Sequence, residues 1–140
     1  MNEDSIILKP IGIIHSPFKK PEGAQTPRHL PLEETAEACA RVEIFPEYEP
    51  GLKDLEGFER IILVFQFNHI HDEKLLVYPY HDRNNLRGVF ATKAPCRPNR
   101  IGVSCVKLVK IEKNILHVKD VDILDGTPLL DIKPYIPRLD

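Results

Sequence analysis

Thirteen prolines are spread along this chain of 140 residues, from Pro10 to Pro137, and they set the strongest limit on its fold. Proline lacks the backbone N–H that a helix interior requires, and it disfavours helix at the residue before it. Prolines spaced in this way break long helices and separate short strands. They do not gather in a linker or a low-complexity tract. The spacing therefore favours a β-rich fold without an internal domain boundary.

Runs rich in β-branched and aromatic residues lie between the prolines, and we expect each to form a strand. Residues 38–45 alternate between apolar and polar side chains, as in a strand with one buried face. Residues 60–67 form the most apolar run and are expected at the centre of the sheet. The predicted strands are residues 5–15, 38–45, 60–67, 75–80, 89–92, 102–111, 115–124 and 129–135.

The connections between these runs carry turn signals. Residues 102–111 and 115–124 are expected to pair as a hairpin, with bulges near Cys105 and Asp120, where the alternation slips. Gly126 can adopt positive φ, which predicts a turn after Asp125. One or two helical turns are expected at residues 49–55.

Short strands at roughly even spacing indicate an all-β fold, either an antiparallel barrel or a sandwich. We predict a closed antiparallel β-barrel with long loops and at most short helices, because closure removes strand edges that such apolar runs would otherwise expose. A hydrophobic content of 42% and the chain length fit one domain spanning residues 1–140.

Charge and cysteine usage indicate the cellular setting. The formal net charge is −2, so any polyanion must be held by a local basic patch. Three cysteines without a C-x-x-C pair favour reduced thiols in an intracellular protein. The N-terminus lacks the features of a signal peptide, and no apolar run approaches membrane-spanning length. We therefore expect a cytoplasmic protein with no membrane partner.

The most basic local segment is residues 90–102, which we call the cationic loop. It carries Lys93, Arg97 and Arg100 with no acidic residue among them, and prolines flank Arg97 on both sides. A stiff loop loses little entropy when it binds an anion, and a guanidinium can bind a carboxylate or phosphate through two parallel hydrogen bonds. The residues alone leave open a rigid surface turn whose charges are only solvated.

Other candidate sites have weaker support. The sequence contains no G-x-G-x-x-G or G-x-x-x-x-G-K motif for a nucleotide. His69, His71 and Asp72 are the best metal candidates, but no further ligands follow at recognisable spacing, so we predict no metal. Cys96 beside Arg97 is a conceivable nucleophile, although a small apolar filler is the favoured interpretation.

Three clusters on predicted loops could form one site. They are Arg28 with His29, the cationic residues 93–100, and the turn at residues 125–127. Residues 16–31 form a long loop, which is typical of a functional or disordered segment, and a surface excursion remains the alternative. If the loops meet at one rim of a barrel, cations facing an Asp-Gly-Thr turn would suit a zwitterionic or nucleotide-like ligand.

Three motifs in this order resemble those of the TsaA-like family, which includes VirR-related proteins. They are Pro-Ile-Gly-Ile-Ile-His-Ser-Pro-Phe at residues 10–18, Ala-Thr-Lys-Ala-Pro-Cys-Arg-Pro-Asn-Arg-Ile-Gly at 91–102, and Asp-Gly-Thr-Pro-Leu-Leu-Asp-Ile-Lys-Pro-Tyr at 125–135. Characterised bacterial members of this family methylate N6 of threonylcarbamoyladenosine at position 37 of tRNA. The resemblance implies a β-barrel that binds S-adenosyl-L-methionine (SAM) without a Rossmann fold, as a homodimer with the cofactor near the subunit contact.

The resemblance also implies roles for individual residues. The cofactor site carried over by motif comprises Pro27, Arg28, His29, Asn68, His69, Lys93, Val103, Leu124, Asp125, Gly126 and Thr127. Arg28 or Lys93 would bind the methionine carboxylate. Asp125 and His29 are the candidates for the base that helps N6 lose its proton. Arg97, Asn99 and Arg100 are assigned by hypothesis to the RNA.

Three departures from the family pattern bear on substrate binding. Lys93 stands where members commonly have arginine, and Arg100 where they commonly have proline. The chain ends at Asp140, whereas bacterial enzymes carry a C-terminal extension, so the short form resembles archaeal members. The alternative function is therefore a SAM-binding regulator or RNA-binding barrel without catalysis. A metal-dependent hydrolase using His69 and His71 is a third possibility.

Overall fold

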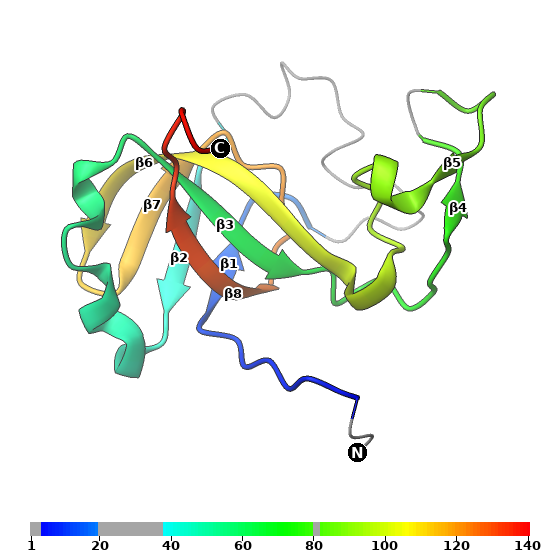
Figure 1. Cartoon of the computed structure of the whole chain (residues 1–140). Helices are drawn as coiled ribbons and strands as arrows, with labels where there is room; N and C mark the ends of the chain where they lie inside the picture. Colours follow the sequence, from blue (N-terminus) through cyan, green and yellow to red (C-terminus); the bar gives the residue numbers. More distant parts are fainter. Residues whose placement is uncertain (1–3, 20–37, 80–81) are drawn as a thin grey trace.

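The computed structural model describes residues 4–19, 38–79 and 82–140, and within these ranges the main body is a closed six-stranded barrel (Figure 1). Its strands follow the order β1-β2-β7-β6-β3-β8, and every neighbouring pair is antiparallel. The bounds are β1 Gly12–His15, β2 Ala40–Ile44, β3 Arg60–Gln66, β6 Ile101–Glu112, β7 Ile115–Lys119 and β8 Thr127–Pro134. The predicted all-β closed antiparallel barrel is confirmed.

Alternating side chains fill the barrel. In β3 every second residue is buried, with Ile61 and Leu63 fully covered and Phe65 1% exposed, and this strand pairs along both edges, with β6 and β8. The other strands direct their alternate apolar residues to the same interior, including Ile14, Val42, Ile44, Val106, Leu116, Val118 and Leu129. Each such side chain contributes roughly 1.5–3 kcal/mol when it is removed from water. The 2-residue period recognised in the sequence therefore encodes the core.

The remaining elements are short. Four 3₁₀ helices, η2 Pro46–Leu52, η3 Leu55–Gly57, η4 Val89–Ala91 and η5 Pro98–Arg100, connect the strands of the described ranges. None of the helices found in these ranges is long and apolar enough to span a membrane. The helical turns expected near residues 49–55 are present, in the 3₁₀ form that suits a segment containing Pro50.

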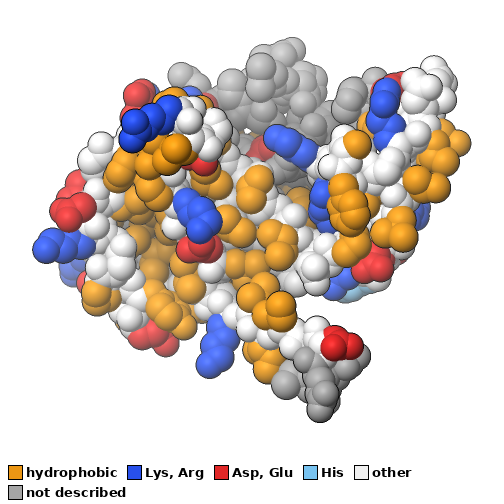
Figure 2. Space-filling view, viewed as in Figure 1, with side chains coloured by type: hydrophobic (Ala, Val, Ile, Leu, Met, Phe, Trp, Pro, Cys, Tyr) orange, Lys and Arg blue, Asp and Glu red, His pale blue; other side chains and the backbone are white. Residues whose placement is uncertain are grey.

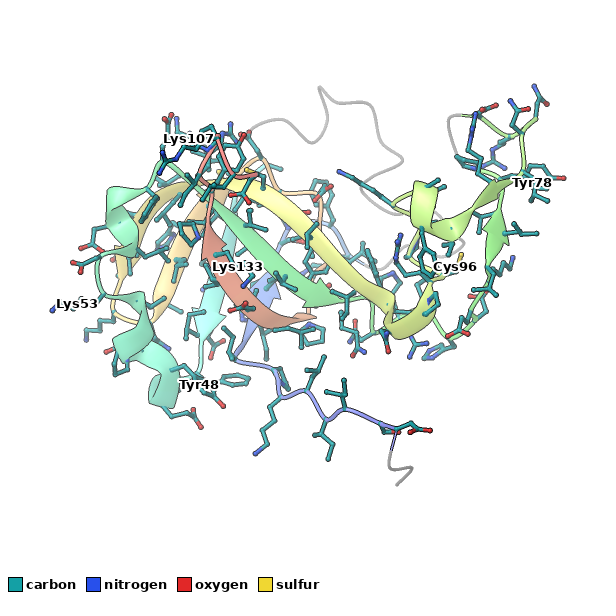
Figure 3. The ribbon with its side chains drawn as sticks, viewed as in Figure 1. Tyr48, Lys53, Tyr78, Cys96, Lys107 and Lys133 are labelled. Carbon is teal, nitrogen blue, oxygen red and sulfur yellow. The ribbon has the colours of Figure 1, made fainter. Side chains whose placement is uncertain are left out.

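A small arm projects beyond the end of β3. It contains a two-stranded ribbon, β4 Leu76–Val77 paired with β5 Arg87–Gly88, and η4. Figure 2 shows apolar side chains gathered on this arm, where Leu75, Leu76, Tyr78, Leu86 and Phe90 are 50–75% exposed. The cationic loop lies where the arm returns to the barrel, and the N–H of Lys74 donates to the carbonyl of Cys96 at this base (Figure 3).

Three local predictions were wrong. Residues 89–92 do not form a strand, because Val89–Ala91 turns back and the N–H of Thr92 donates to the carbonyl of Val89. Of the strand expected at 75–80, only β4 is found among the described residues 75–79. The bulge expected near Cys105 is absent, since the register between β3 and β6 runs unbroken from Arg60↔Lys107 to Gln66↔Ile101.

The strand limits near the other predicted irregularity also differ from expectation. The register of β6 and β7 shifts between Leu108 and Lys110. β7 ends at Lys119, and Asp120 has a φ of 65°, so the chain leaves the sheet there instead of bulging. At the N-terminus, only the last four residues of the predicted strand 5–15 belong to a strand.

Gly12 permits the close approach of β1 and β2. It lies opposite Ile44, and a Cβ at this position would overlap the backbone carbonyl of Glu43. The obstacle is backbone in a paired strand, so it cannot rotate away as a side chain would. Only glycine fits the present separation of these two strands.

We predict that Gly12→Ala lowers the free energy of unfolding by about 1–3 kcal/mol, because β1 must shift relative to its neighbour. Urea unfolding followed by far-UV circular dichroism measures the change. Gly51→Ala is the matched control, since a Cβ at Gly51 meets no atom within 4 Å. Equal stability of the two variants would contradict the steric role of Gly12.

Candidate active site

The cationic loop is fastened to the end of β3 in an unusual backbone conformation. Asn99 and Arg100 have φ angles of 63° and 50°, so two consecutive non-glycine residues are left-handed. The carbonyl of Arg100 accepts the N–H of Phe67 at 2.8 Å, and its own N–H donates to the carbonyl of Arg97 at 3.0 Å. Such conformations are costly, and they concentrate at binding and catalytic sites.

The side chain of Arg97 stabilises the cationic loop itself by hydrogen bonds to two of its carbonyl groups. Its Nη1 donates to the carbonyl of Thr92 at 2.7 Å and to that of Ala94 at 3.3 Å. These two bonds fix the plane of the guanidinium. The other guanidinium N–H groups make no hydrogen bond to the described residues, so Arg97 can still bind an anion from a fixed position. This bracing was not evident from the sequence, because it involves backbone acceptors.

A pocket of about 160 Å³ lies against this loop. Its lining consists of Phe67, Thr92, Lys93, Arg97, Ile101, Gly102 and Val103. The predicted cofactor residues Lys93 and Val103 are therefore brought together, and Arg97, which we assigned to the RNA, joins them. The volume is below the 300–1,000 Å³ of typical ligand sites, so this pocket would hold only part of a nucleotide-sized molecule.

One aromatic ring, that of Phe67, lines this pocket, and it packs against Phe65 of the barrel core. Phe65 and Phe67 meet edge to face with their centroids 5.3 Å apart. A Cβ at Gly102 would lie 2.6–2.8 Å from their ring atoms, so the glycine is needed for this packing. The ring of His69 in turn meets Phe67 edge to face at 6.4 Å, while Asn68 is exposed. Sequence analysis missed Phe67, although its place at the end of the most apolar run was a usable signal.

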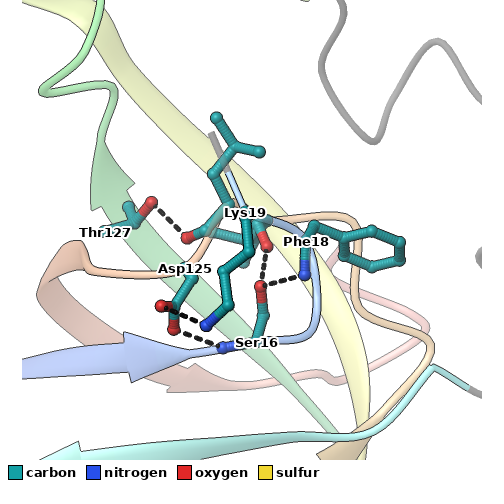
Figure 4. Close-up of polar contacts among 7 residues, drawn as sticks. Ser16, Phe18, Lys19, Asp125 and Thr127 are labelled. Atoms are coloured by element: carbon teal, nitrogen blue, oxygen red, sulfur yellow. Dashed lines mark hydrogen bonds and ion pairs between the residues drawn. The ribbon is translucent and has the colours of Figure 1, made fainter. Parts of the chain in front are cut away.

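The first and third motifs meet at the turn formed by Asp125 and Gly126 (Figure 4). Asp125 Oδ1 accepts the N–H of Ser16 at 3.0 Å, and its Oδ2 accepts from Lys19 Nζ at 2.9 Å. The N–H of Asp125 donates to the carbonyl of Phe18 at 2.7 Å. Gly126 has a φ of 82°, which confirms the predicted turn. Ser16 and Lys19 were not predicted, because they lie more than a hundred residues away in sequence.

Leu124 and Thr127 shape this turn from within. Both are buried, and Thr127 Oγ1 donates to the carbonyl of Leu124 at 2.7 Å. Ser16 Oγ donates to the carbonyl of Ile123 at 2.6 Å and accepts the N–H of Phe18. The turn is thus held by side-chain bonds on both sides, which leaves the Asp125 carboxylate in a fixed orientation.

The environment of Asp125 favours its charged form. The hydrogen bond from Lys19 is the largest cause that lowers the pKa of this carboxyl, followed by the N–H of Ser16, and partial burial opposes them. A carboxylate with a lowered pKa is a weaker base. It is better suited to accept a hydrogen bond from an ammonium or hydroxyl group.

The two predicted halves of the cofactor site line different hollows within the described ranges. Lys93 and Val103 face the small pocket, whereas Asp125 lines a groove of about 520 Å³ on the outer side of β1, β2, β7 and β6. Pro27, Arg28 and His29 lie outside the described residues. Among the side chains that are described, no three histidines, cysteines or acids form a group that could hold a metal ion.

The sequence matches the family described as the tRNA-methyltransferase O N-terminal domain over residues 13–140. The chain belongs to this family. This finding confirms the resemblance that was based on the three motifs, and the motifs are the segments that build the cationic loop and the Asp125 turn.

Individual relatives agree with this assignment. The chain is 52% identical over 138 residues to a probable S-adenosyl-L-methionine-binding protein of Pyrococcus abyssi, covering 96% of this chain and 71% of that protein. It is 37% identical to a mouse tRNA (adenine(37)-N6)-methyltransferase, covering 97% of this chain and 32% of the enzyme. The crystal structure of TrmO from Pseudomonas aeruginosa superposes with a TM-score of 0.77 at 33% identity, covering 97% of this chain and 58% of that one. The chain thus spans only part of the relatives that are named as methyltransferases.

We predict that Asp125→Asn destabilises the protein at pH 7 by on the order of 1 kcal/mol, because it removes a charged acceptor that is partly exposed. The pKa of Asp125 is lowered on folding, so its contribution is present above the unfolded value of about 3.9 and is lost as the pH falls through the folded value. Unfolding at several pH values should show the difference from wild type shrinking below about pH 4. Asp131→Asn, which alters the exposed pair with Lys133, is the control. A deficit independent of pH would contradict this account.

Proposed function

We propose that this chain is a SAM-dependent methyltransferase that acts on N6 of threonylcarbamoyladenosine at position 37 of tRNA. The observation that carries the proposal is that the three family motifs build the cationic loop and the Asp125 turn, both of which are held by side-chain hydrogen bonds and contain residues with positive φ. The family membership and the relatives named as SAM-binding proteins or tRNA methyltransferases support it. The relatives support methylation of tRNA, and the presence of a threonylcarbamoyl group on the acceptor adenosine is our more specific proposal.

The two loops line different hollows, so a single SAM molecule that contacts both would have to span them, and the residues on each side suit different parts of SAM. Lys93, exposed and with no described acidic partner, would bind the methionine carboxylate, and Val103 would cover an apolar part of the ligand. Asp125, held by Ser16 and Lys19, would accept from the amino group or a ribose hydroxyl. Pro27, Arg28 and His29 complete the proposed site. When bound, the sulfonium supplies an already activated methyl group.

The protein's own task is then to align the acceptor and to help N6 lose its proton. Of the two candidate bases, Asp125 already accepts two hydrogen bonds and has a lowered pKa. This favours His29 as the base and gives Asp125 a binding role. Arg97, Asn99 and Arg100 remain assigned to the RNA, with Arg97 also bracing the loop.

We also propose that the chain acts in the cytoplasm as a homodimer with the cofactor near the subunit contact. The exposed apolar side chains of the arm support a contact there, because soluble proteins rarely leave such patches uncovered. Phe90, 75% exposed, lies three residues before Lys93 in the chain, which would bring the contact near the small pocket. The odd count of three cysteines without a C-x-x-C pair supports a reducing compartment.

The alternative is a SAM-binding regulator or RNA-binding barrel without catalysis. The Pyrococcus abyssi relative is named for SAM binding alone, and the lowered pKa of Asp125 makes this candidate a weaker base. Both functions require the same cofactor contacts. They differ only in whether the methyl group is transferred from SAM to an acceptor.

A transfer assay tests the proposal. Purified protein is incubated with methyl-labelled SAM and tRNA, and the nucleosides are separated by mass spectrometry. We expect label on N6 of threonylcarbamoyladenosine and none on tRNA that lacks the threonylcarbamoyl group. Label on unmodified adenine 37 would show that the acceptor is adenine 37 without the threonylcarbamoyl group. Bound SAM without transfer to any tRNA would favour the alternative.

The two cationic residues of the pocket should separate cofactor binding from RNA binding. We predict that Lys93→Ala weakens SAM binding about tenfold, the value of one charge-assisted hydrogen bond. Arg97→Ala should reduce tRNA methylation more than it weakens SAM binding. Calorimetry with SAM and the transfer assay measure the two effects. Lys74→Ala, on the same arm and paired with Asp72, is the control. Equal loss of both activities in Arg97→Ala would contradict this division.

A further inference from the structure

The outer face of the barrel carries a row of basic side chains across four strands. The register places His15 of β1 opposite Arg41 of β2, Arg41 opposite His117 of β7, and His117 opposite Lys110 of β6. Residues paired in this way project from the same face of a sheet. With adjacent strands about 4.8 Å apart, the row spans about 14 Å. No sequence motif revealed it, because its members come from four separate segments.

A second pair of cations adjoins this row. Lys119 is two residues beyond His117 on β7, so it projects from the same face, and it lies opposite Lys107 of β6. Like charges directly opposite each other destabilise a sheet. In the described part of the chain, neither lysine has an ion pair, and Arg41 has none. Folding alone does not favour this arrangement, whereas a bound anion would stabilise it.

The two acidic residues nearby, Glu43 and Glu112, each accept a hydrogen bond from a histidine, which is an ion pair only when that histidine is protonated. Glu43 accepts from His15 Nε2 at 2.9 Å. Glu112 accepts from His117 Nε2 at 2.9 Å and from Lys110 Nζ at 3.0 Å, and the bond from Lys110 is the largest cause of its lowered pKa. With the histidines counted as neutral, as in the net charge of the chain, Lys110 offsets Glu112. Arg41, Lys107 and Lys119 then outnumber Glu43 among the remaining charges of this face.

This face is hollowed instead of flat. The groove of about 520 Å³ is lined by the row and by Lys119, and Asp125 is the one acid in its described lining. Lys19 pairs with that acid at 2.9 Å. The chain as a whole has a net charge of −2, so the positive charge is concentrated here by the fold. At one end the groove reaches the Asp125 turn, where we place part of the cofactor.

We propose that this groove binds the sugar-phosphate backbone of the RNA substrate. The inference rests on the proposed function and extends it, because the cationic loop would hold the modified nucleotide while this face holds flanking phosphates. Arginine and lysine side chains without protein partners are the usual ligands of backbone phosphates, and such contacts position the nucleic acid without reading its sequence.

Charge reversal in the groove tests the inference. The variant Arg41→Glu/Lys119→Glu is compared with wild type for tRNA binding by fluorescence anisotropy, without SAM, between 50 and 200 mM salt. We expect about a tenfold or greater loss of affinity, and a slope of log K against log salt that is smaller by about 1.5, as two lost phosphate contacts imply. Arg41→Gln/Lys119→Gln is the milder form, used if the reversal variant fails to fold by circular dichroism.

The control variant Lys53→Glu/Lys133→Glu makes the same change in net charge elsewhere. Lys133 is on β8, which lies across the barrel from β7, and Lys53 is on the loop between η2 and η3 (Figure 3). We expect the control to bind tRNA within about twofold of wild type. Equal losses in both double variants, an unchanged salt slope, or binding of polyglutamate as tight as that of tRNA would each overturn the groove assignment. Because binding is measured without SAM, a protein that binds tRNA through the groove but transfers no methyl group would refute only the proposed function.

Discussion

The pairing of β1 with both of its neighbours is the constraint on which the rest of the molecule depends. This strand has four residues, yet it joins β2 on one edge and β8 on the other, and so closes the sheet. Its carbonyl at Ile14 then accepts the N–H of Gly126, and the next residues bond to Asp125. The same strand therefore both closes the barrel and positions the Asp125 turn. A protein that lost this contact would lose its core and half of its candidate site together.

Local pattern was sufficient to predict most of the barrel. The alternation at residues 38–45 and 60–67 and the hairpin of β6 and β7 were all recognisable, because a 2-residue period survives any tertiary context that keeps one face buried. It failed at residues 89–92, where strand-forming residues have no barrel strand beside them. Strand propensity is a property of one segment, whereas a strand forms only where a second strand lies beside it to accept and donate its backbone hydrogen bonds.

The candidate site was predictable as a set of loops but not as a set of contacts. Motifs identified the cationic loop and the Asp125 turn, and both of these segments contain residues with positive φ. Nothing local in sequence indicated that Lys19 would neutralise Asp125, that Arg97 would brace its own loop, or that Arg41 would stand beside His117. Such relations follow from register and closure, which single-sequence patterns specify only in part.

A closed sheet has further consequences for how this protein can associate. Every barrel strand has a neighbour on both sides, but the pairing covers only part of the longest strands. Within the described ranges β6 pairs with β3 over residues 101–107 and with β7 over residues 107–112, and β8 pairs with β1 over residues 127–129 only. The short ribbon of β4 and β5 is different, because each of its strands has a neighbour on one side only. Backbone-to-backbone recruitment of an extended peptide, in the manner of β-augmentation, is therefore limited, among the described strands, to the projecting ribbon and to the lengths of β6 and β8 that are paired on one side only.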